Sequence, residues 1–438
     1  MKNLENNQKQ SNMQKVALTA LAGTSIEWYD FFLYGAAAAL IFPTAFFGEM
    51  PPTTALLLSL LTFAAGFIAR PIGGIIFGHF GDKVGRKKTL ISALMLMGIS
   101  STLIGLLPTY AMIGVAAPIL LTSLRFAQGL AIGGQWGGAM LLVTESAPSN
   151  QRGYYGAFAQ AGAPIGVILA NLALIITSAL VSEEFFNTWG WRIPFLASAV
   201  LILISMYIQL NLEDTDAFKA LVDNKGTQSD ENIKKSPVIE AIKKYPKRIF
   251  LAAGAFLSVQ VTFYILIAFM LAYGVTSANM ARDDMLAAVL IASAIMVPIQ
   301  FVFSSYSDRH GRKGIFMLGA VLTGIWAFAI FPLVDTGNFY LIVLAITGGL
   351  VFLAMMYGPQ AAFFTELFST EVRYSGATLG YQFGAIVGGA FAPTIAVKLW
   401  TEFDIIWVSA YIALASLLTL ISVMALTETY QSDLNNTD

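Results

Sequence analysis

Two short stretches with the same spacing decide how this chain folds: GHFGDKVGRKK at residues 78–88 and SSYSDRHGRKG at residues 304–314. Each has an aspartate, a glycine three positions later and then Arg-Lys, namely Asp82, Gly85, Arg86 and Lys87, and Asp308, Gly311, Arg312 and Lys313. Glycine permits a tight turn, aspartate is favourable at a helix N-terminus, and basic side chains favour the lipid surface. We interpret each stretch as a charged turn between two membrane helices.

A second pair of similar stretches follows in the same order. TESAPSNQRGYYG at residues 144–156 parallels TELFSTEVRYSG at residues 365–376. Glu145 and Arg152 are seven positions apart, as are Glu366 and Arg373. Two repeated pairs in the same order indicate an internal duplication, which is common among secondary transporters.

The composition is that of a membrane protein. Hydrophobic residues make up 57% of the 438 residues and charged residues 12%, whereas soluble domains carry about 25% charged residues. The net charge of −1 gives no indication of nucleic-acid binding. The chain has no cysteine and only two histidines, His79 and His310, so we expect no disulfide, no metal and no cofactor. It has no HExxH or P-loop motif, and we predict that it is not an enzyme.

Twelve apolar runs are long enough to cross a bilayer, which takes about 20 residues each. The first run contains Glu27 and Asp30 and is too long for a signal peptide, so we interpret it as a retained helix. The predicted spans are 16–42, 54–79, 89–107, 112–144, 153–181, 190–210, 247–274, 284–305, 314–334, 338–365, 373–398 and 404–427.

A polar segment divides these runs into two sets of six. Most of the 25 Lys and Arg residues fall in the N-terminal tail, this segment and the loops after even-numbered helices, which predicts that both termini are cytoplasmic. The predicted fold is an all-α membrane protein of two pseudo-symmetric six-helix bundles. Its parts are an N-terminal tail (1–15), a first bundle (16–210), a cytoplasmic linker (211–246), a second bundle (247–427) and a C-terminal tail (428–438).

The turn at residues 78–88 resembles the signature of the major facilitator superfamily. Three further stretches, GTSIEWYDFFLYG at 23–35, ARPIGGIIFGHFGD at 69–82 and RFAQGLAIGGQWGGAMLLVTESAP at 125–148, resemble its metabolite:proton symporter family, as do WGWRIPF at 189–195 and TELFSTEVRYSGATLGYQ at 365–382. That family includes shikimate, α-ketoglutarate, citrate and proline/betaine permeases. The resemblance covers essentially the whole chain and implies a multi-pass transporter in a bacterial inner membrane.

Charged residues inside the bilayer are costly and mark candidate functional sites. Glu27, Asp30 and Tyr34 share one face of the first helix, and Arg125 lies in the fourth. We predict that Asp30 or Glu27 pairs with Arg125 across a central cavity and that this pair couples proton movement to transport; a static ion pair that fixes helix packing is the alternative. For Arg70 we favour a structural role where the second and eleventh helices meet.

Polar residues on the predicted cavity helices are candidates for substrate binding. They are Tyr34, Arg125, Gln128, Gln135, Trp136, Gln160, Gln260, Tyr264, Tyr357, Gln360, Tyr381 and Gln382. The alternative for each of them is a hydrogen bond between helices. Gln135 departs from the resembled family, in which glutamate is usual, and glutamine cannot carry a proton.

The repeated loops predict a cytoplasmic gate. Its residues are Asp82, Gly85, Arg86, Lys87, Glu145, Arg152, Asp308, Gly311, Arg312, Glu366 and Arg373. We predict a monomeric, proton-coupled transporter of a small polar metabolite, favouring an organic acid, that works by alternating access. Proton-coupled efflux of drugs or aromatic metabolites is the main alternative, and a membrane-embedded sensor is a more distant one.

Overall fold

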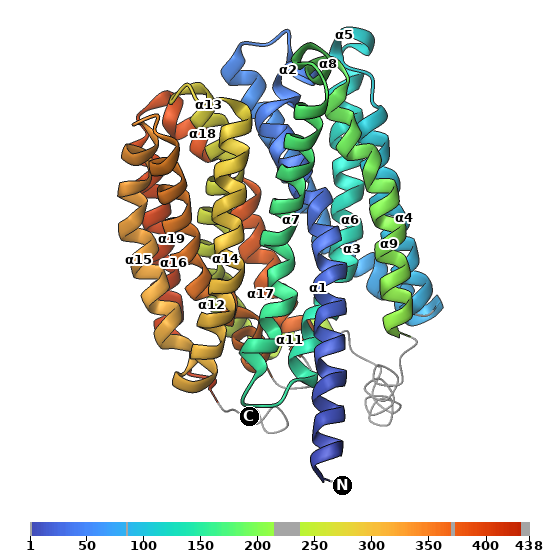
Figure 1. The fold of residues 1–438 in the computed structure, drawn as a ribbon. Helices are drawn as coiled ribbons and strands as arrows, with labels where there is room; N and C mark the ends of the chain where they lie inside the picture. The colour runs from blue at the N-terminus through green and yellow to red at the C-terminus, as the bar shows by residue number, and fades with distance from the viewer. Residues whose placement is uncertain (1, 85, 214–236, 369–372, 431–438) are drawn as a thin grey trace.

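The computed structural model describes residues 2–84, 86–213, 237–368 and 373–430. Within these ranges it leaves out the side chains of residues 2–12, 78–84, 86–90, 134–139, 141, 142, 146, 208–213, 237–240 and 374. The described part is almost entirely helical (Figure 1).

Six long helices form the first half of the chain. They are α1 (Lys2–Leu40), α3 (Pro52–Val84), α4 (Arg86–Leu106), α6 (Ala116–Ser146), α7 (Arg152–Leu180) and α9 (Ile193–Glu213). Four short elements join them: α2 (Phe42–Phe47), α5 (Tyr110–Ile113), α8 (Glu183–Thr188) and the 3₁₀ turn η1 (Gly190–Arg192). A further short helix, α11 (Pro237–Lys244), precedes the second half.

The second half also has six spans, and π-helical segments interrupt two of them. One combines α12 (Pro246–Tyr264), the π segment η2 (Ile265–Phe269) and α13 (Met270–Thr276); the other combines α17 (Arg373–Gly384), the π segment η3 (Ala385–Ala390) and α18 (Ala392–Glu402). The remaining helices are α14 (Arg282–His310), α15 (Arg312–Val334), α16 (Phe339–Glu366) and α19 (Ile406–Ala425). Such π segments occur frequently at functional sites.

The predicted twelve-helix fold is confirmed. Ten helices of the described chain are long and apolar enough to cross a membrane, and α1 and α4 complete the twelve. Some boundaries were wrong: α1 begins at Lys2, and the fourth span begins at Ala116 because Gly114, with φ of 60°, separates it from α5. Pro393 lies where α18 restarts after η3, whereas α7 continues through Pro164.

The two halves lie side by side, with α7 of the first half packed along α14 and α16 of the second (Figure 1). The start of α1 and the last described residues, which follow α19, lie at the same end of the bundle, here named the terminal end, and α2, α5 and α8 lie at the opposite, far end. Helix α1 contacts η2 and α13, and α3 contacts η3 and α18. The π segments therefore lie at the interface between the halves.

Helices α3 and α6 approach very closely because glycines face backbone at their crossing. A Cβ on Gly129 would overlap the carbonyl of Gly66, and one on Gly133 would overlap the carbonyl of Arg70. Small residues of this kind allow membrane helices to pack through their backbones. The crossing of α3 and α6 is therefore a close packing surface within the first half.

Candidate functional site

A small pocket lies between the two halves at their centre. Trp28, Phe32 and Ala163 line it from the first half. The second half contributes Phe256, Val259, Gln260, Phe263, Tyr264, Leu353, Tyr357 and Tyr381. Four of the predicted substrate-binding residues, Gln260, Tyr264, Tyr357 and Tyr381, thus meet here. Ligand sites typically combine mostly apolar walls with a few polar groups in this way.

Three further predicted residues are buried, but they do not line this pocket. The Gln160 amide donates to the backbone oxygen of Tyr357 at 3.2 Å, which joins α7 to α16 across the halves. The Oε1 atoms of Gln360 and Gln382 are buried and lack a hydrogen-bond partner within the described chain. Gln160 therefore makes a contact between helices, while the other two carbonyls keep free acceptor capacity.

Asp30 and Arg125 do not form the predicted ion pair across a cavity. The Ser198 hydroxyl donates to Asp30 Oδ1, and Asp30 Oδ2 lacks a partner among the described residues. Arg125 Nη1 instead donates to Gln128 Oε1 at 3.1 Å, and Gln128 Nε2 donates to Ser101 at 2.7 Å. Both charged groups are almost fully buried inside the first half, and Glu27 is partly buried.

Aromatic rings surround the Arg125 guanidinium. Its central carbon lies 4.1 Å from the ring centre of Phe31, 4.3 Å from that of Tyr34 and 4.6 Å from that of Phe63. The Tyr34 hydroxyl shares a 2.6 Å hydrogen bond with Thr62. Tyr34, Arg125 and Gln128 therefore belong to the interior of the first half. In this conformation they do not line the central pocket, and their role in substrate binding stays a prediction.

The geometry of α1 explains this difference. In a helix, residues four apart share a face, so Trp28 and Phe32 lie together, and it is this face that meets the pocket. Asp30 and Tyr34 face α9 and α3 instead. The polar side chains of the first helix predicted the wrong face of that helix as the face toward the pocket. The aromatic pair at positions 28 and 32 marks the face that meets the pocket.

A charged network joins the halves at the terminal end. Arg152 of the first half lies 3.9 Å from Glu366 of the second, and Arg373 lies 3.4 Å from Glu145. The two repeated stretches thus exchange partners, because the arginine of each contacts the glutamate of the other. Burial lowers the pKa of the Arg373 guanidinium, an effect that the neighbouring Glu145 carboxylate partly offsets.

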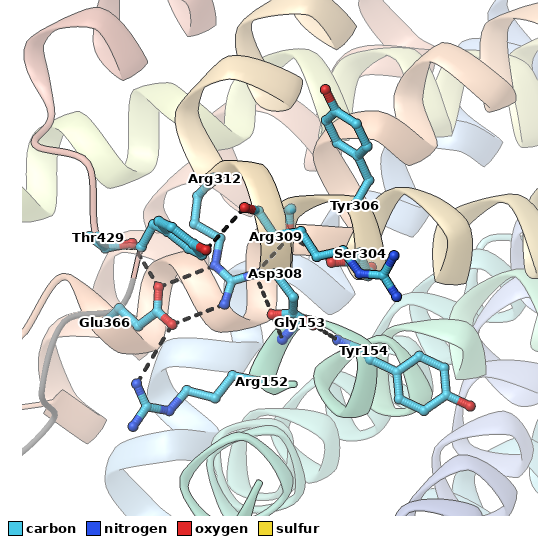
Figure 2. Close-up of polar contacts among 12 residues, drawn as sticks. Arg152, Gly153, Tyr154, Ser304, Tyr306, Asp308, Arg309, Arg312, Glu366 and Thr429 are labelled. Carbon is cyan, nitrogen blue, oxygen red and sulfur yellow. Dashed lines mark hydrogen bonds and ion pairs between the residues drawn. The ribbon is translucent and has the colours of Figure 1, made fainter. Parts of the chain in front are cut away.

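Figure 2 shows the centre of this network around Arg312. Arg312 Nη2 lies 3.1 Å from Glu366, and Arg312 Nη1 lies 2.7 Å from Asp308. Asp308 in turn accepts hydrogen bonds of 2.8 Å from the backbone N–H groups of Gly153 and Tyr154, at the N-terminus of α7. A carboxylate is favourable there because the N–H groups at a helix start lack partners within the helix.

Gly311 forms the turn between α14 and α15. Its φ of 100° is a conformation that other residues rarely adopt. This geometry fits the predicted tight turn. Gly85 lies outside the described residues, as do the side chains of Asp82, Arg86 and Lys87, so the matching turn in the first half stays a prediction. The same holds for the side chains of Gln135 and Trp136.

The C-terminal segment binds the same network, which the sequence did not indicate. Glu428 accepts hydrogen bonds of 3.0 Å from the backbone N–H groups of Arg312 and Lys313, at the start of α15. The Thr429 hydroxyl donates to Glu366 Oε2 at 2.7 Å (Figure 2). The predicted boundary of the C-terminal tail at residue 428 thus falls on residues that contact the charged network.

Contacts between the halves are also present at the far end. The Ser178 hydroxyl donates to Asp283 at 2.7 Å, and the Asn171 amide donates to the backbone oxygen of Leu286 at 3.2 Å. Both bonds join α7 to α14. Since the halves are in contact at both ends with a pocket between them, the structure is an occluded conformation.

Replacing Glu366 by glutamine is expected to open the terminal end. Arg312, Arg152 and Thr429 all contact this carboxylate, and removing one partner from a buried ion pair costs about 3 to 5 kcal/mol. Spin labels on the substitutions Asn150→Cys, just before α7, and Arg309→Cys, in α14, would report the separation of these helices, since the chain has no native cysteine. We expect a longer-distance population in Glu366→Gln.

The control for this variant is Lys398→Gln, which breaks an exposed 3.8 Å pair with Glu402. Exposed pairs contribute little, so we expect it to leave the distance distribution unchanged. An unchanged distribution in Glu366→Gln would show that the network does not hold the terminal end closed.

Two halves in contact at both ends around a central pocket, in a bundle of twelve membrane-spanning helices, define a membrane transport protein. The family model for the Major Facilitator Superfamily matches residues 20–379, and the chain belongs to this family. The members that it resembles are transport proteins and not enzymes.

Named relatives cover most of the chain. It is 40% identical to the inner membrane metabolite transport protein YhjE of Escherichia coli K12, over 97% of this chain and 96% of the relative. It is 37% identical to the shikimate transporter of the same organism, over 92% of each. A proline/betaine transporter of Escherichia coli K12 is 33% identical, over 91% of this chain and 80% of the relative.

Solved structures match the fold. A crystal structure of a D-xylose–proton symporter has a TM-score of 0.74 with this chain, at 17% identity, and the match covers 95% of this chain and 99% of the other. A partially occluded, inward-open structure of the Escherichia coli xylose transporter XylE has a TM-score of 0.71, also at 17% identity, over 96% and 99%. At this level of identity the likeness concerns the fold alone.

Proposed function

We propose that this chain is a proton-coupled symporter that moves a small organic acid across a bacterial inner membrane by alternating access. The observation that carries the proposal is Asp30, which is 1% exposed and keeps one carboxylate oxygen without a partner among the described residues. Leaving a buried charge uncompensated is costly, and a proton removes that cost. Asp30 is therefore suited to take up and release a proton as the halves rearrange.

Arg125 is the natural partner in this cycle. In the occluded conformation it donates to Gln128 while Ser198 holds Asp30. A rearrangement that brings the guanidinium to the carboxylate favours the charged form of Asp30, and separation favours the protonated form. Coupling through Asp30 does not need an acid at position 135, where the chain has glutamine.

The relatives support the organic acid. Shikimate, proline and betaine, named for the transporters that resemble this chain, all contain a carboxylate. We also infer that the terminal end is cytoplasmic, with residues 1–15 and 428–438 as tails and 211–246 as a linker, because most basic residues lie in these segments and in neighbouring loops.

Transport into proteoliposomes tests the proposal. We expect labelled shikimate, proline or betaine to accumulate when the pH outside is lower than inside, and a protonophore to abolish the accumulation. The control is the same vesicles without protein. Accumulation that continues in the presence of the protonophore would exclude proton symport.

A second candidate function is proton-coupled export of an aromatic compound. The aromatic side chains of Trp28, Phe32, Phe256 and Phe263 in the pocket favour it. Export by antiport predicts the opposite dependence in the same vesicles, with uptake driven when the inside is the acidic compartment. The direction of the effective gradient therefore separates the two functions.

A further inference from the structure

We propose that Arg70, which lies behind the lining residue Trp28 of the central pocket, is the receptor for the carboxylate of the transported solute. This inference rests on the proposed function, and it names the side chain and the chemical group that it binds. The sequence favoured a structural role for Arg70 where the second and eleventh helices meet.

The Arg70 guanidinium is buried, and it has no counterion among the described residues. Its residue is 1% exposed, and its Nε and Nη2 atoms lack hydrogen-bond partners within the described chain. None of the ion pairs in that part of the chain includes it. A buried cation without a partner is strongly unfavourable unless another group meets it. The structure thus leaves two charged donors available to an anion.

Aromatic rings hold this guanidinium in place. Its central carbon lies 4.3 Å from the ring centre of Phe67, 4.4 Å from that of Phe31 and 5.5 Å from that of Trp28. Cation–π contacts orient arginine and leave its in-plane N–H donors free for a carboxylate. Three buried rings packed on one guanidinium in this way form a built site, not an accidental gap.

The site is continuous with the pocket. The rings of Phe31 and Phe67, which pack on Arg70, have their centres 6.2 Å and 5.1 Å from the ring centre of Tyr264. Tyr264 lines the pocket, as does Trp28. The Nε2 donor of Gln260, another lining residue, also lacks a partner among the described residues. The unpaired donors around the pocket therefore come from both halves.

The π segments support the same assignment. Segment η2 begins immediately after Tyr264, and Gly389 of η3 packs against Tyr264 and Phe67, where a Cβ would lie 2.9 Å and 3.1 Å from their rings. Two helix irregularities thus meet the residues that hold Arg70. Movement of either span would change the access of a solute to the guanidinium.

Arg125 is less suited to this role. Its Nη1 atom donates to Gln128, while its Nε and Nη2 atoms, like those of Arg70, lack partners among the described residues. Phe31, Tyr34 and Phe63 enclose its guanidinium inside the first half. Neither arginine lines the pocket itself, but Trp28, which packs on Arg70, does, whereas none of the three rings around Arg125 is a lining residue. We therefore separate the two arginines by function: Arg70 binds the solute anion, and Arg125 works with Asp30.

Equilibrium binding to the purified full chain tests the inference without a gradient, so its result is independent of proton coupling. The probes are shikimate and betaine, each compared with its methyl ester. We expect at least one acid to bind wild type more tightly than its ester, and Arg70→Gln to lose about thirtyfold or more of the acid affinity. Arg309→Gln, which removes an exposed charge at the terminal end, is the control and should bind normally.

Thermal stability distinguishes binding from structure. Arg70→Met replaces the unpaired cation by an apolar side chain of similar length, so the melting temperature without solute should not fall. A structural arginine would lower it. Gly389→Ala keeps the charge of Arg70, but its added methyl group presses on Tyr264 and Phe67. We expect it to weaken acid binding more than ester binding. This variant tests the site even if the Arg70 variants do not fold.

Three results would overturn the assignment. They are equal affinity of wild type for acids and esters, wild-type acid binding by Arg70→Gln, and loss of acid binding in Arg125→Gln while Arg70→Gln retains it. Uptake that continues in the presence of a protonophore would instead refute the symport mechanism and leave the carboxylate site standing.

Discussion

Asp30→Asn is expected to abolish solute accumulation driven by a proton gradient while leaving exchange of labelled for unlabelled solute intact. Asparagine keeps the shape of the side chain and can accept the hydrogen bond from Ser198, but it cannot take up a proton. A pH difference of two units stores about 2.7 kcal/mol per proton and drives roughly 100-fold accumulation. The variant should therefore equilibrate its solute and reach no excess inside the vesicles.

Two measurements on the same vesicles make the result specific. Counterflow needs only the alternation of the loaded carrier, so it should continue at a comparable rate in Asp30→Asn. Asp404→Asn is the matched control, because Asp404 is exposed and caps the backbone of Ile406 through a bond that asparagine can also accept. Full accumulation by Asp30→Asn would refute the coupling role of Asp30.

The fold could be predicted from the sequence because bilayer thickness fixes the length of each apolar run. The segment between the sixth and seventh spans has no apolar run long enough to cross the bilayer, so it marked the boundary between the halves. The ends of helices were harder to place. Gly114 interrupts the fourth span through its backbone conformation, and α1 extends to Lys2 through polar residues that carry no hydropathy signal.

The repeated loops contain residues that meet at the terminal end, and their role as a gate stays a prediction. Glu145, Arg152, Glu366 and Arg373 were identified by their spacing, and the structure adds that each arginine contacts the glutamate of the other half. Spacing along one chain cannot show such an exchange, since it depends on how the halves face each other. The contribution of Glu428 and Thr429 was missed because they lie in a short polar segment without a motif.

The pocket was the least predictable part. Polarity alone selected Tyr34, Gln128 and Arg125, yet these side chains make hydrogen bonds and ring contacts inside the first half and do not line the pocket. Burial within a bundle and burial in a cavity give the same sequence pattern. Only the rotation of α1, which turns Trp28 and Phe32 toward the second half, separates the two.

Gly133→Ala is expected to destabilise the protein and to disturb the solute site at the same time. A Cβ at this position would overlap the backbone carbonyl of Arg70, which cannot turn away as a side chain could. Overpacking typically costs about 1 to 3 kcal/mol, and a clash with backbone belongs at the upper end. Because the displaced residue is Arg70 itself, acid binding should weaken together with the fall in melting temperature.

The matched control is Gly314→Ala in α15, where a Cβ would meet no atom within 4 Å. Alanine favours a helix over glycine by about 1 kcal/mol, so this variant should be as stable as wild type or more stable. The comparison isolates the close crossing of α3 and α6 from the general effect of replacing a helical glycine. If Gly133→Ala melts and binds like Gly314→Ala, α3 and α6 do not need this close approach, and the position of Arg70 must be fixed by its aromatic neighbours instead.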